Sequence, residues 1–195
     1  MRVAIMALQG AFAEHSLLLR RLGVETFEIR QLSDWEQPKD GLIIPGGEST
    51  TQIKLFNKLG FYAPVKESIT AGLPVFGTCA GLILLSRNVE GSSFETLATM
   101  DITACRNVYG RQLGSFHTAG SFVGIDNEIP MTFIRAPYIK SVKSGVDVLS
   151  VVNDRIVAAR QNNQLVTAFH PELDGDTSVH EYFLNMIKSI TVNSI

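Results

Sequence analysis

Short apolar runs alternate with amphipathic stretches through roughly the first half of the chain. Val3–Leu8 and Gly41–Ile44 are continuously apolar, which predicts strands covered on both faces, whereas Val24–Ile29 alternates like a further short strand. Between these runs, apolar residues at helical spacing predict helices around residues 14–22, 52–59 and 63–71. This alternation implies βαβ units with right-handed crossovers and a parallel sheet.

The second half of the chain has a different pattern of predicted elements. Few helical stretches separate its β-type runs, which lie at 100–105, 116–125, 131–134, 146–152 and 155–159. Leu165–Phe169 predicts one more buried strand, and apolar positions between Val179 and Ile190 predict a final amphipathic helix. We therefore expect one α/β domain over residues 1–195, with three layers, a mostly parallel central sheet flanked by helices, and an antiparallel extension.

Two predicted turns or helices begin with capping patterns. Ser33 is followed three residues later by Glu36, which is typical of a capped turn. Ser49, Thr50 and Thr51 stand just before the second predicted helix, and their hydroxyl groups favour a helix start there.

Composition narrows the functional classes. The 195 residues are 45% hydrophobic and 18% charged, and the formal charge is −2. These values are typical of a globular protein, and the absence of a basic run argues against a nucleic-acid partner. No apolar run approaches the ~20 residues of a membrane span, and the N-terminus does not resemble a signal peptide. We expect a cytoplasmic enzyme with free thiols at its two cysteines, away from any membrane.

One cysteine lies where a buried strand is expected to turn into a helix. In Val75–Leu85 an apolar run ends at Gly77, Cys79 lies between Gly77 and Gly81, and a second apolar run follows. This is the cysteine version of the nucleophile elbow, in which small flanking residues let strand and helix approach closely. The amides at the helix N-terminus favour a thiolate and a nearby oxyanion. A small buried residue is the alternative interpretation of a cysteine in such a run.

A cysteine nucleophile needs a base, because an ordinary thiol with a pKa of ~8.5 is mostly protonated at neutral pH. His170, at the end of the last predicted buried strand, is the candidate: it would take the thiol proton and later protonate a leaving amine. Glu172 is on the same side of an extended segment and can accept the other imidazole N–H. The remaining histidines, His15, His117 and His180, have no carboxylate at a useful spacing in the sequence, which favours packed or solvated roles.

Other loops carry weaker signals. Gly46 and Gly47, within Pro45–Thr50, can present backbone N–H groups to a ligand, although a plain turn fits the same residues. Arg106 and Arg135 could clamp a carboxylate, but surface ion pairing is common for single arginines, and the pattern does not decide between them. No Cys/His grouping has zinc spacing, so neither a metal nor a cofactor is implied.

Taken together, these residues resemble class-I, triad-type glutamine amidotransferases, and within them the glutaminase subunits of pyridoxal 5'-phosphate synthase. The Cys79 elbow and the His-Pro-Glu loop match the superfamily, while the blocks around Gly46 and Ile134 match the vitamin B6 branch. The resemblance runs nearly end to end and is carried by Ala7–Ala11, Pro45–Thr51, Phe76–Leu82, Arg106–Asn107, Gly110–Gln112, Phe133–Pro137, Asn153–Arg155 and His170–Leu173. Segments 92–99 and 117–120 depart from the family pattern, away from the expected triad.

The resemblance implies a flavodoxin-like amidotransferase fold and a triad of Cys79, His170 and Glu172. It implies that L-glutamine is held by six residues and that two backbone N–H groups meet the oxyanion. The glutamine-binding residues would be Gly46, Gly47, Glu48, Arg106, Ile134 and Arg135, and the oxyanion donors Gly47 and Ala80.

The family hydrolyses L-glutamine to glutamate and ammonia. The ammonia passes to a (β/α)8 synthase partner that makes pyridoxal 5'-phosphate from pentose and triose phosphates, with glutaminases arranged on a dodecameric synthase core. Family members are nearly inactive until they dock on that partner. Three alternatives stay open: a glutaminase subunit of another biosynthetic amidotransferase, a non-catalytic regulatory subunit on the same fold, and a different cysteine hydrolase.

Overall fold

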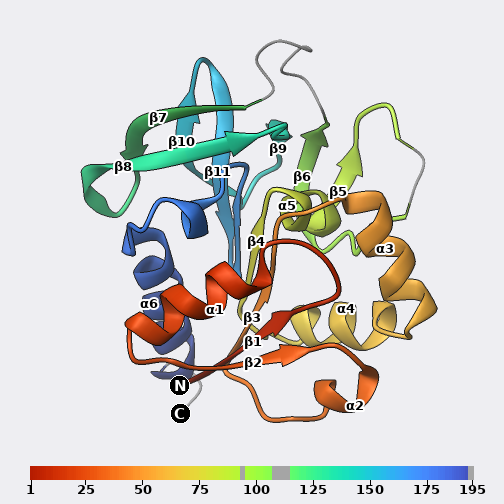
Figure 1. The fold of residues 1–195 in the computed structure, drawn as a ribbon. Helices are drawn as coiled ribbons and strands as arrows, with labels where there is room; N and C mark the ends of the chain where they lie inside the picture. Colours follow the sequence, from red (N-terminus) through yellow and green to blue (C-terminus); the bar gives the residue numbers. More distant parts are fainter. Residues whose placement is uncertain (93–94, 107–114, 193–195) are drawn as a thin grey trace.

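The structure is a computed structural model that describes residues 1–92, 95–106 and 115–192. Within these residues, ten strands form one sheet with the path β2-β1-β3-β4-β12-β11-β9-β6-β5, and β10 pairs with β11 (Figure 1). β7 and β8 form a separate hairpin. The strands are β1 (Arg2–Met6), β2 (Glu25–Ile29), β3 (Gly41–Ile44), β4 (Val75–Thr78), β5 (Ser86–Val89), β6 (Met100–Cys105), β7 (Ser115–Phe122), β8 (Ile125–Ile134), β9 (Tyr138–Val142), β10 (Asp147–Val152), β11 (Arg155–Gln161) and β12 (Gln164–Thr167).

Helices cover both faces of the parallel half of the sheet, β2-β1-β3-β4-β12. The predicted fold class, mixed α/β with a mostly parallel central sheet and an antiparallel extension, is confirmed. α1 and α6 lie on one face, and α3, α4 and α5 lie on the other (Figure 1). The helices are α1 (Phe12–Arg21), α2 (Leu32–Trp35), α3 (Ser49–Lys58), α4 (Tyr62–Thr70), α5 (Ala80–Leu85) and α6 (Ser178–Val192), with the short 3₁₀ helix η1 (Pro171–Leu173).

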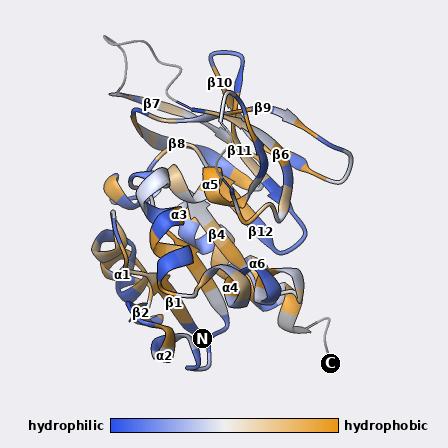
Figure 2. Ribbon diagram, turned by 90° about the vertical axis from the view of Figure 1, so that its right-hand side faces the viewer, coloured by the Kyte–Doolittle hydropathy of each residue, from blue (hydrophilic) through white to orange (hydrophobic). Residues whose placement is uncertain are grey.

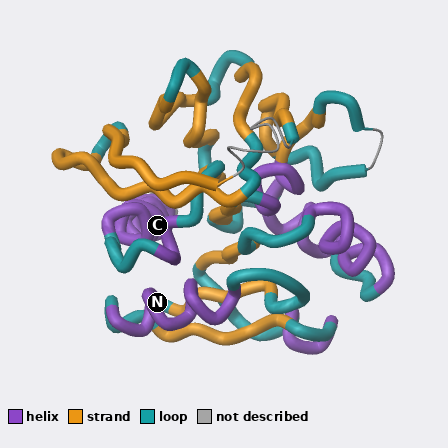
Figure 3. The backbone as a smooth tube through the Cα atoms, turned by 45° about the horizontal axis from the view of Figure 1, so that its top comes forward, coloured by secondary structure: helices purple, strands orange, loops and turns teal. Residues whose placement is uncertain are grey.

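The burial of the strands explains why their sequences read as continuous apolar runs. Every residue of β3, β4 and β12 is buried, because each strand has neighbours on both sides and helices on both faces. α5 is hydrophobic along its length and is buried throughout (Figure 2). The antiparallel strands β7 and β8 instead form a hairpin that extends beside α6 (Figures 1 and 3).

Several predicted elements differ from the structure. Two predicted strands have other bounds: the strand predicted at 116–125 ends at Phe122, because Gly124 adopts a φ of +90° and turns the chain, and the strand predicted at 131–134 begins already at Ile125. β5 and β9 were not predicted. β5 exposes Arg87 and Asn88, and β9 has Ile139 as its one buried residue, so neither has the apolar pattern of a strand.

The two predicted caps are also wrong. α2 is capped by Gln31, which forms a capping box with Asp34, in place of Ser33 and Glu36. The cap of α3 is Glu48, whose carboxylate accepts from the backbone N–H groups of Thr50 and Thr51 at 3.1 and 2.7 Å. Ser49 is therefore the first residue of the helix. A carboxylate at this position also interacts favourably with the helix dipole.

None of the helices in the described part of the chain combines the length and the apolar character of a membrane span.

Candidate active site

Four neighbouring parallel strands end at the same edge of the sheet and deliver the candidate residues there. In order across the sheet these strands are β1, β3, β4 and β12. Thr167 of β12 is paired in register with Thr78 of β4, so Cys79 and the loop to His170 leave the sheet side by side. β3 pairs with β4 on the other side and leads into the glycine loop. This is the edge where open α/β sheets bind ligands.

Cys79 occupies the predicted corner between β4 and α5. Its φ is +47°, a region that non-glycine residues rarely adopt and that costs about 1–3 kcal/mol. The corner is tight: a Cβ on Gly77 would lie 2.7 Å from the carbonyl carbon of Gly81, and one on Gly81 would lie 2.1 Å from the carbonyl oxygen of Ile44. Both flanking glycines are therefore required for the strand, the helix and the neighbouring strand to approach each other.

His170 and Glu172 form a buried pair beside this corner. His170 Nδ1 lies 2.7 Å from Glu172 Oε1, and the imidazole lines the same cavity as Cys79. Because Nδ1 is bonded to the carboxylate, it is Nε2 that remains for the cysteine. The backbone N–H of His170 donates to the carbonyl oxygen of Thr132 at 2.8 Å, which fixes the loop to β8.

The environment of His170 favours its protonated form. Burial alone would lower its pKa, but the hydrogen bonds to Cys79 and Glu172 and their negative charge outweigh burial and raise the pKa to about 10. At neutral pH the imidazole thus holds a proton beside the Cys79 side chain. This is the charge distribution that a cysteine nucleophile and a general acid require.

The glycine loop is held firmly against the elbow. The N–H of Gly46 donates to Thr78 Oγ1 at 2.9 Å, and its carbonyl oxygen accepts from the N–H of Ala11 at 3.1 Å. A Cβ on Gly46 would lie 2.3 Å from His170 Cε1. The absence of a side chain at this position therefore lets the imidazole pack directly on the loop.

A cavity of about 320 Å³ opens in front of Cys79, within the range of small-molecule sites. Seven of the predicted site residues line it together: Gly47, Glu48, Cys79, Arg106, Ile134, Arg135 and His170. Of the other three, Gly46 and Glu172 pack behind His170, and Ala80 is the first residue of α5. The Gly110–Gln112 block of the expected family pattern lies outside the described residues.

The charged groups at the cavity are arranged around the start of α3. Arg106 donates to Thr50 Oγ1 at 3.2 Å and lies 3.7 Å from Glu48 Oε1. Burial would raise the pKa of Glu48, but hydrogen bonds from Thr51 and Thr50 outweigh it and lower the pKa to about 2. The cavity thus carries a fixed carboxylate beside two arginines, a combination suited to an amino acid with both an ammonium and a carboxylate group.

Comparison with known proteins identifies the family. The model of the SNO glutamine amidotransferase family matches residues 5–189. The chain belongs to this family. It is 59% identical over 187 residues to the pyridoxal 5'-phosphate synthase subunit PdxT of Methanocorpusculum labreanum, covering 96% of this chain and 98% of that protein. It is 53% identical over 191 residues to the PdxT of Streptococcus pneumoniae, with the same coverage.

Solved structures agree with this assignment. A crystal structure described as a glutamine amidotransferase superposes with a TM-score of 0.90 at 39% identity, covering 95% of this chain and 98% of that one. A structure described as a putative GMP synthase subunit from Thermoplasma acidophilum gives a TM-score of 0.70 at 16% identity, covering 100% and 97%. At that identity the likeness concerns the fold alone.

Sequence reasoning missed two residues of this candidate site. Gln9 lines the cavity, and its Oε1 accepts from the N–H of Glu48 at 2.8 Å, so it fastens the glycine loop. His15 is fully buried, and its Nε2 lies 3.5 Å from Glu172 Oε2. Gln9 lies in one of the blocks shared with the family but carried no assigned role.

His15 is buried and His117 is exposed, as the expected packed and solvated roles require, but each has a carboxylate neighbour that is distant in the sequence. His117 Nε2 lies 3.4 Å from Asp174 Oδ1. His180 is packed, as expected, against His15. Cys105 is a buried residue of β6, and its thiol donates to Glu90.

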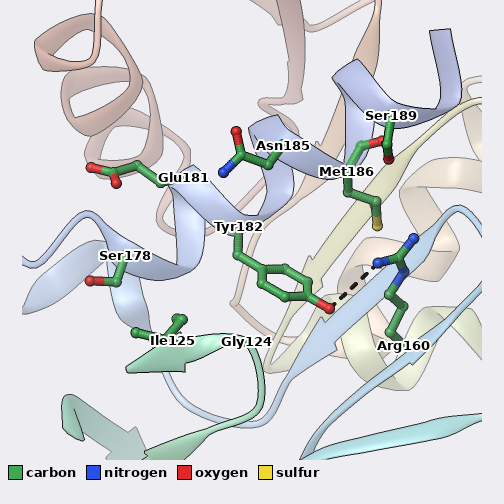
Figure 4. Close-up of a pocket in the computed structure, with 9 residues that line it drawn as sticks. All are labelled: Gly124, Ile125, Arg160, Ser178, Glu181, Tyr182, Asn185, Met186 and Ser189. Atoms are coloured by element: carbon green, nitrogen blue, oxygen red, sulfur yellow. Dashed lines mark hydrogen bonds between the residues drawn. The ribbon is translucent and has the colours of Figure 1, made fainter. Parts of the chain in front are cut away.

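A second cavity of about 420 Å³ lies along α6, away from Cys79 (Figure 4). Arg160 Nη1 lies 3.5 Å from the hydroxyl of Tyr182 across it. None of the predicted site residues lines this cavity, which contains no cysteine or histidine. The cavity with the larger volume is therefore not the one that the predicted site residues line.

Proposed function

We propose that the chain hydrolyses L-glutamine to L-glutamate and ammonia, with Cys79 as nucleophile, and supplies the ammonia to a pyridoxal 5'-phosphate synthase. The observation that carries the proposal is the continuous buried chain of Cys79, His170 and Glu172 at the wall of a cavity lined by the glycine loop and two arginines. Membership of a glutamine amidotransferase family supports the same reaction.

The reaction proceeds through a thioester. The Cys79 thiolate attacks the side-chain carbonyl carbon of glutamine, and the C–N bond breaks as His170 Nε2–H protonates the departing amine, which leaves as ammonia. Water then attacks the thioester carbonyl while His170 takes its proton, and glutamate leaves as the thiol is restored. Glu172 stabilises the imidazolium and fixes the tautomer in both steps.

The oxyanion of each tetrahedral intermediate is assigned to the backbone N–H groups of Gly47 and Ala80. Ala80 opens α5, where the first N–H groups of a helix have no partner within the helix. Gly47 lines the cavity on the opposite loop. Two donors from separate loops would meet a charge that develops only in the transition state.

Glutamine itself is assigned to the residues around the cavity mouth. Arg106 and Arg135 can bind the α-carboxylate, and Glu48 can bind the α-ammonium group. Gly46, Gly47 and Ile134 shape the space for the side chain. Arg135 has a φ of +43°, a conformation that the chain maintains beside the cavity.

The partner follows from the relatives, which are named as subunits of pyridoxal 5'-phosphate synthase. We assign this chain as the glutaminase subunit that works with a (β/α)8 synthase subunit, on a dodecameric synthase core. We further place it in the cytoplasm, as one domain over residues 1–195. The free thiols of Cys79 and Cys105 fit a reducing compartment.

Glutamate release from glutamine, measured with and without the synthase subunit, tests this function. Cys79→Ala should abolish release, because no other described group lies in place to form the thioester, whereas Cys105→Ser should retain it. Activity that survives in Cys79→Ala and is lost in Cys105→Ser would overturn the assignment. A wild-type chain that releases no glutamate with its partner would instead indicate a regulatory subunit.

A further inference from the structure

Glu172 has one oxygen that the triad does not use. Its side chain is fully buried, and Oε1 accepts from His170, yet within the described residues Oε2 has no hydrogen bond that meets ordinary geometry. A buried carboxylate oxygen without a donor is costly, on the order of 1–3 kcal/mol or more. Nε2 of His15 lies 3.5 Å from this oxygen.

His15 is itself backed by a second buried histidine. His15 Nδ1 lies 2.8 Å from Nε2 of His180 on α6, and both side chains are 0% exposed. Burial lowers the pKa of His15 well below its ordinary value, helped by the charges of His180 and His170, and lowers the pKa of His180 to about 4. Both imidazoles are therefore neutral at neutral pH, and a single proton lies between their two facing nitrogens.

The surroundings favour one placement of that proton. If His180 Nε2–H donates to His15 Nδ1, the proton of His15 is on Nε2, where it points toward Glu172. His180 Nδ1, which has no partner among the described residues, is then a bare lone pair. The opposite placement leaves a buried N–H on His180 without an acceptor, and it turns a lone pair of His15 toward the carboxylate oxygen. A buried N–H without an acceptor costs more free energy than a buried lone pair without a donor, so the first placement is favoured.

We propose that His15, oriented by His180, is a positioning residue for the triad: it donates from Nε2 to Glu172 Oε2 and holds the carboxylate against His170. This rests on the proposed glutaminase reaction. The 3.5 Å separation suits a contact that tightens when substrate is bound, since catalytic hydrogen bonds are often long in ligand-free sites.

The same imidazole also contacts Thr78, the β4 residue that holds the glycine loop. His15 Nε2 lies 3.3 Å from Thr78 Oγ1, which accepts from the N–H of Gly46. His15 therefore contacts both the residue that orients the base and the residue that fixes the proposed oxyanion loop. The ionisable groups around it are His180 from α6 and His170 and Glu172 from the η1 loop, and Asp176 acts on His180.

A packing role would have a different signature. The rings of His15 and His180 both make T-shaped contacts with the Phe76 ring, at centroid distances of 6.1 and 5.6 Å, so replacing either histidine will change the core. If packing were their whole contribution, the variants would lose stability and leave the turnover of the folded fraction, its pH dependence and its KM unchanged.

The test compares His15→Leu and His15→Gln in the full chain with its synthase partner, by glutamate release across pH. His15→Leu should lower kcat about 10- to 100-fold with KM for glutamine within about twofold of wild type, the range for losing a residue that orients a catalytic group. The acidic limb of the kcat profile should move to higher pH, because the carboxylate has lost its donor. His15→Gln, whose amide N–H reaches a similar position, should recover most of kcat.

Leu19→Ala is the matched control, because Leu19 is a fully buried residue of the same helix. It should lower the melting temperature and leave kcat and the pH profile unchanged.

Equal losses in His15→Leu and His15→Gln with an unmoved acidic limb, or a wild-type kcat in His15→Leu, would overturn the proposal. If His15→Leu does not fold, His180→Phe decides instead: a lowered kcat with a moved limb supports the proposal, and an unchanged profile refutes it. Wild-type glutamate release in the same assay tests the proposed function separately.

Discussion

Gly46→Ala is a small substitution that should disable the site without unfolding the chain. Gly46 does not adopt a positive φ, so its backbone accepts an alanine without conformational strain. The added Cβ would lie 2.3 Å from His170 Cε1, 2.9 Å from His170 Nδ1 and 3.2 Å from Cys79 Cβ. The substitution therefore acts on the base and the nucleophile and on no other described side chain that close.

The size of the effect follows from these distances. Carbon atoms in contact ordinarily lie about 3.5–4.0 Å apart, so the imidazole must move by about 1 Å. A displacement of that size at a reacting group costs roughly 10²-fold in rate, or about 2.7 kcal/mol of transition-state stabilisation. The stability cost of overpacking, about 1–3 kcal/mol, should lower the melting temperature by several degrees and leave the chain folded at 25 °C.

The assay is kcat/KM for glutamate release with the synthase partner, together with a thermal melt. Gly120→Ala is a matched control, because its Cβ would come closest to the flexible end of Met131, at 3.3 Å, and would lie at an ordinary contact distance of 3.6 Å from Val152 Cγ2. It should retain wild-type kcat/KM. A Gly46→Ala chain that is folded and keeps more than half of wild-type kcat/KM would refute the argument that close packing of His170 on this loop sets the geometry of the site.

Two further predictions concern the charges of the site. Glu172→Gln should lower kcat at least about tenfold. It should also move the alkaline limb of the kcat profile to lower pH, because losing the carboxylate charge lowers the raised pKa of His170. An alkaline limb that stays in place would contradict this cause. Acid should destabilise the chain through the neutral buried histidines. Because the pKa of His180 is lowered from 6.5 to about 4, the unfolded state binds more protons than the folded state between these two pH values. Stability that is present above pH 6.5 is therefore lost as the pH falls toward 4, by up to about 3 kcal/mol. Melting temperatures measured from pH 7 to 4 should therefore fall less steeply for His180→Phe than for the wild type, and equal slopes would exclude His180 as the cause.

The sequence was most informative where a residue's neighbours in the chain are also its neighbours in space. The elbow around Cys79 and the pairing of His170 with Glu172 are each contained in a few residues, so strand, turn and partner could be predicted together. The buried strands β1, β3, β4 and β12 were predictable for a related reason: burial on both faces leaves a continuous apolar run.

Prediction failed where the partner is distant along the chain or where the local pattern is polar. His15 and Glu172 are 157 positions apart, and nothing at helical spacing around His15 indicates a carboxylate. Glu48 was not recognised as the cap of α3, because Ser and Thr follow it directly and are the commoner capping residues. β5 is short and polar, so only its pairing with β6 defines it.

The position of each element in the sheet divides the site into two halves with different tasks. The groups assigned to bond making and breaking, Cys79 and His170, follow β4 and β12 in the parallel half, where helices cover both faces. Arg106 and Arg135, assigned to the substrate carboxylate, follow β6 and β8 in the antiparallel part. Catalytic geometry is thus built on the most deeply packed strands, whose burial holds atoms in place to a fraction of an ångström. Binding of the substrate carboxylate is assigned to strands that pack on fewer sides, which tolerate the adjustments that a bound ligand requires. Glu48 and the glycine loop, assigned to the rest of the glutamine, follow β3 in the parallel half.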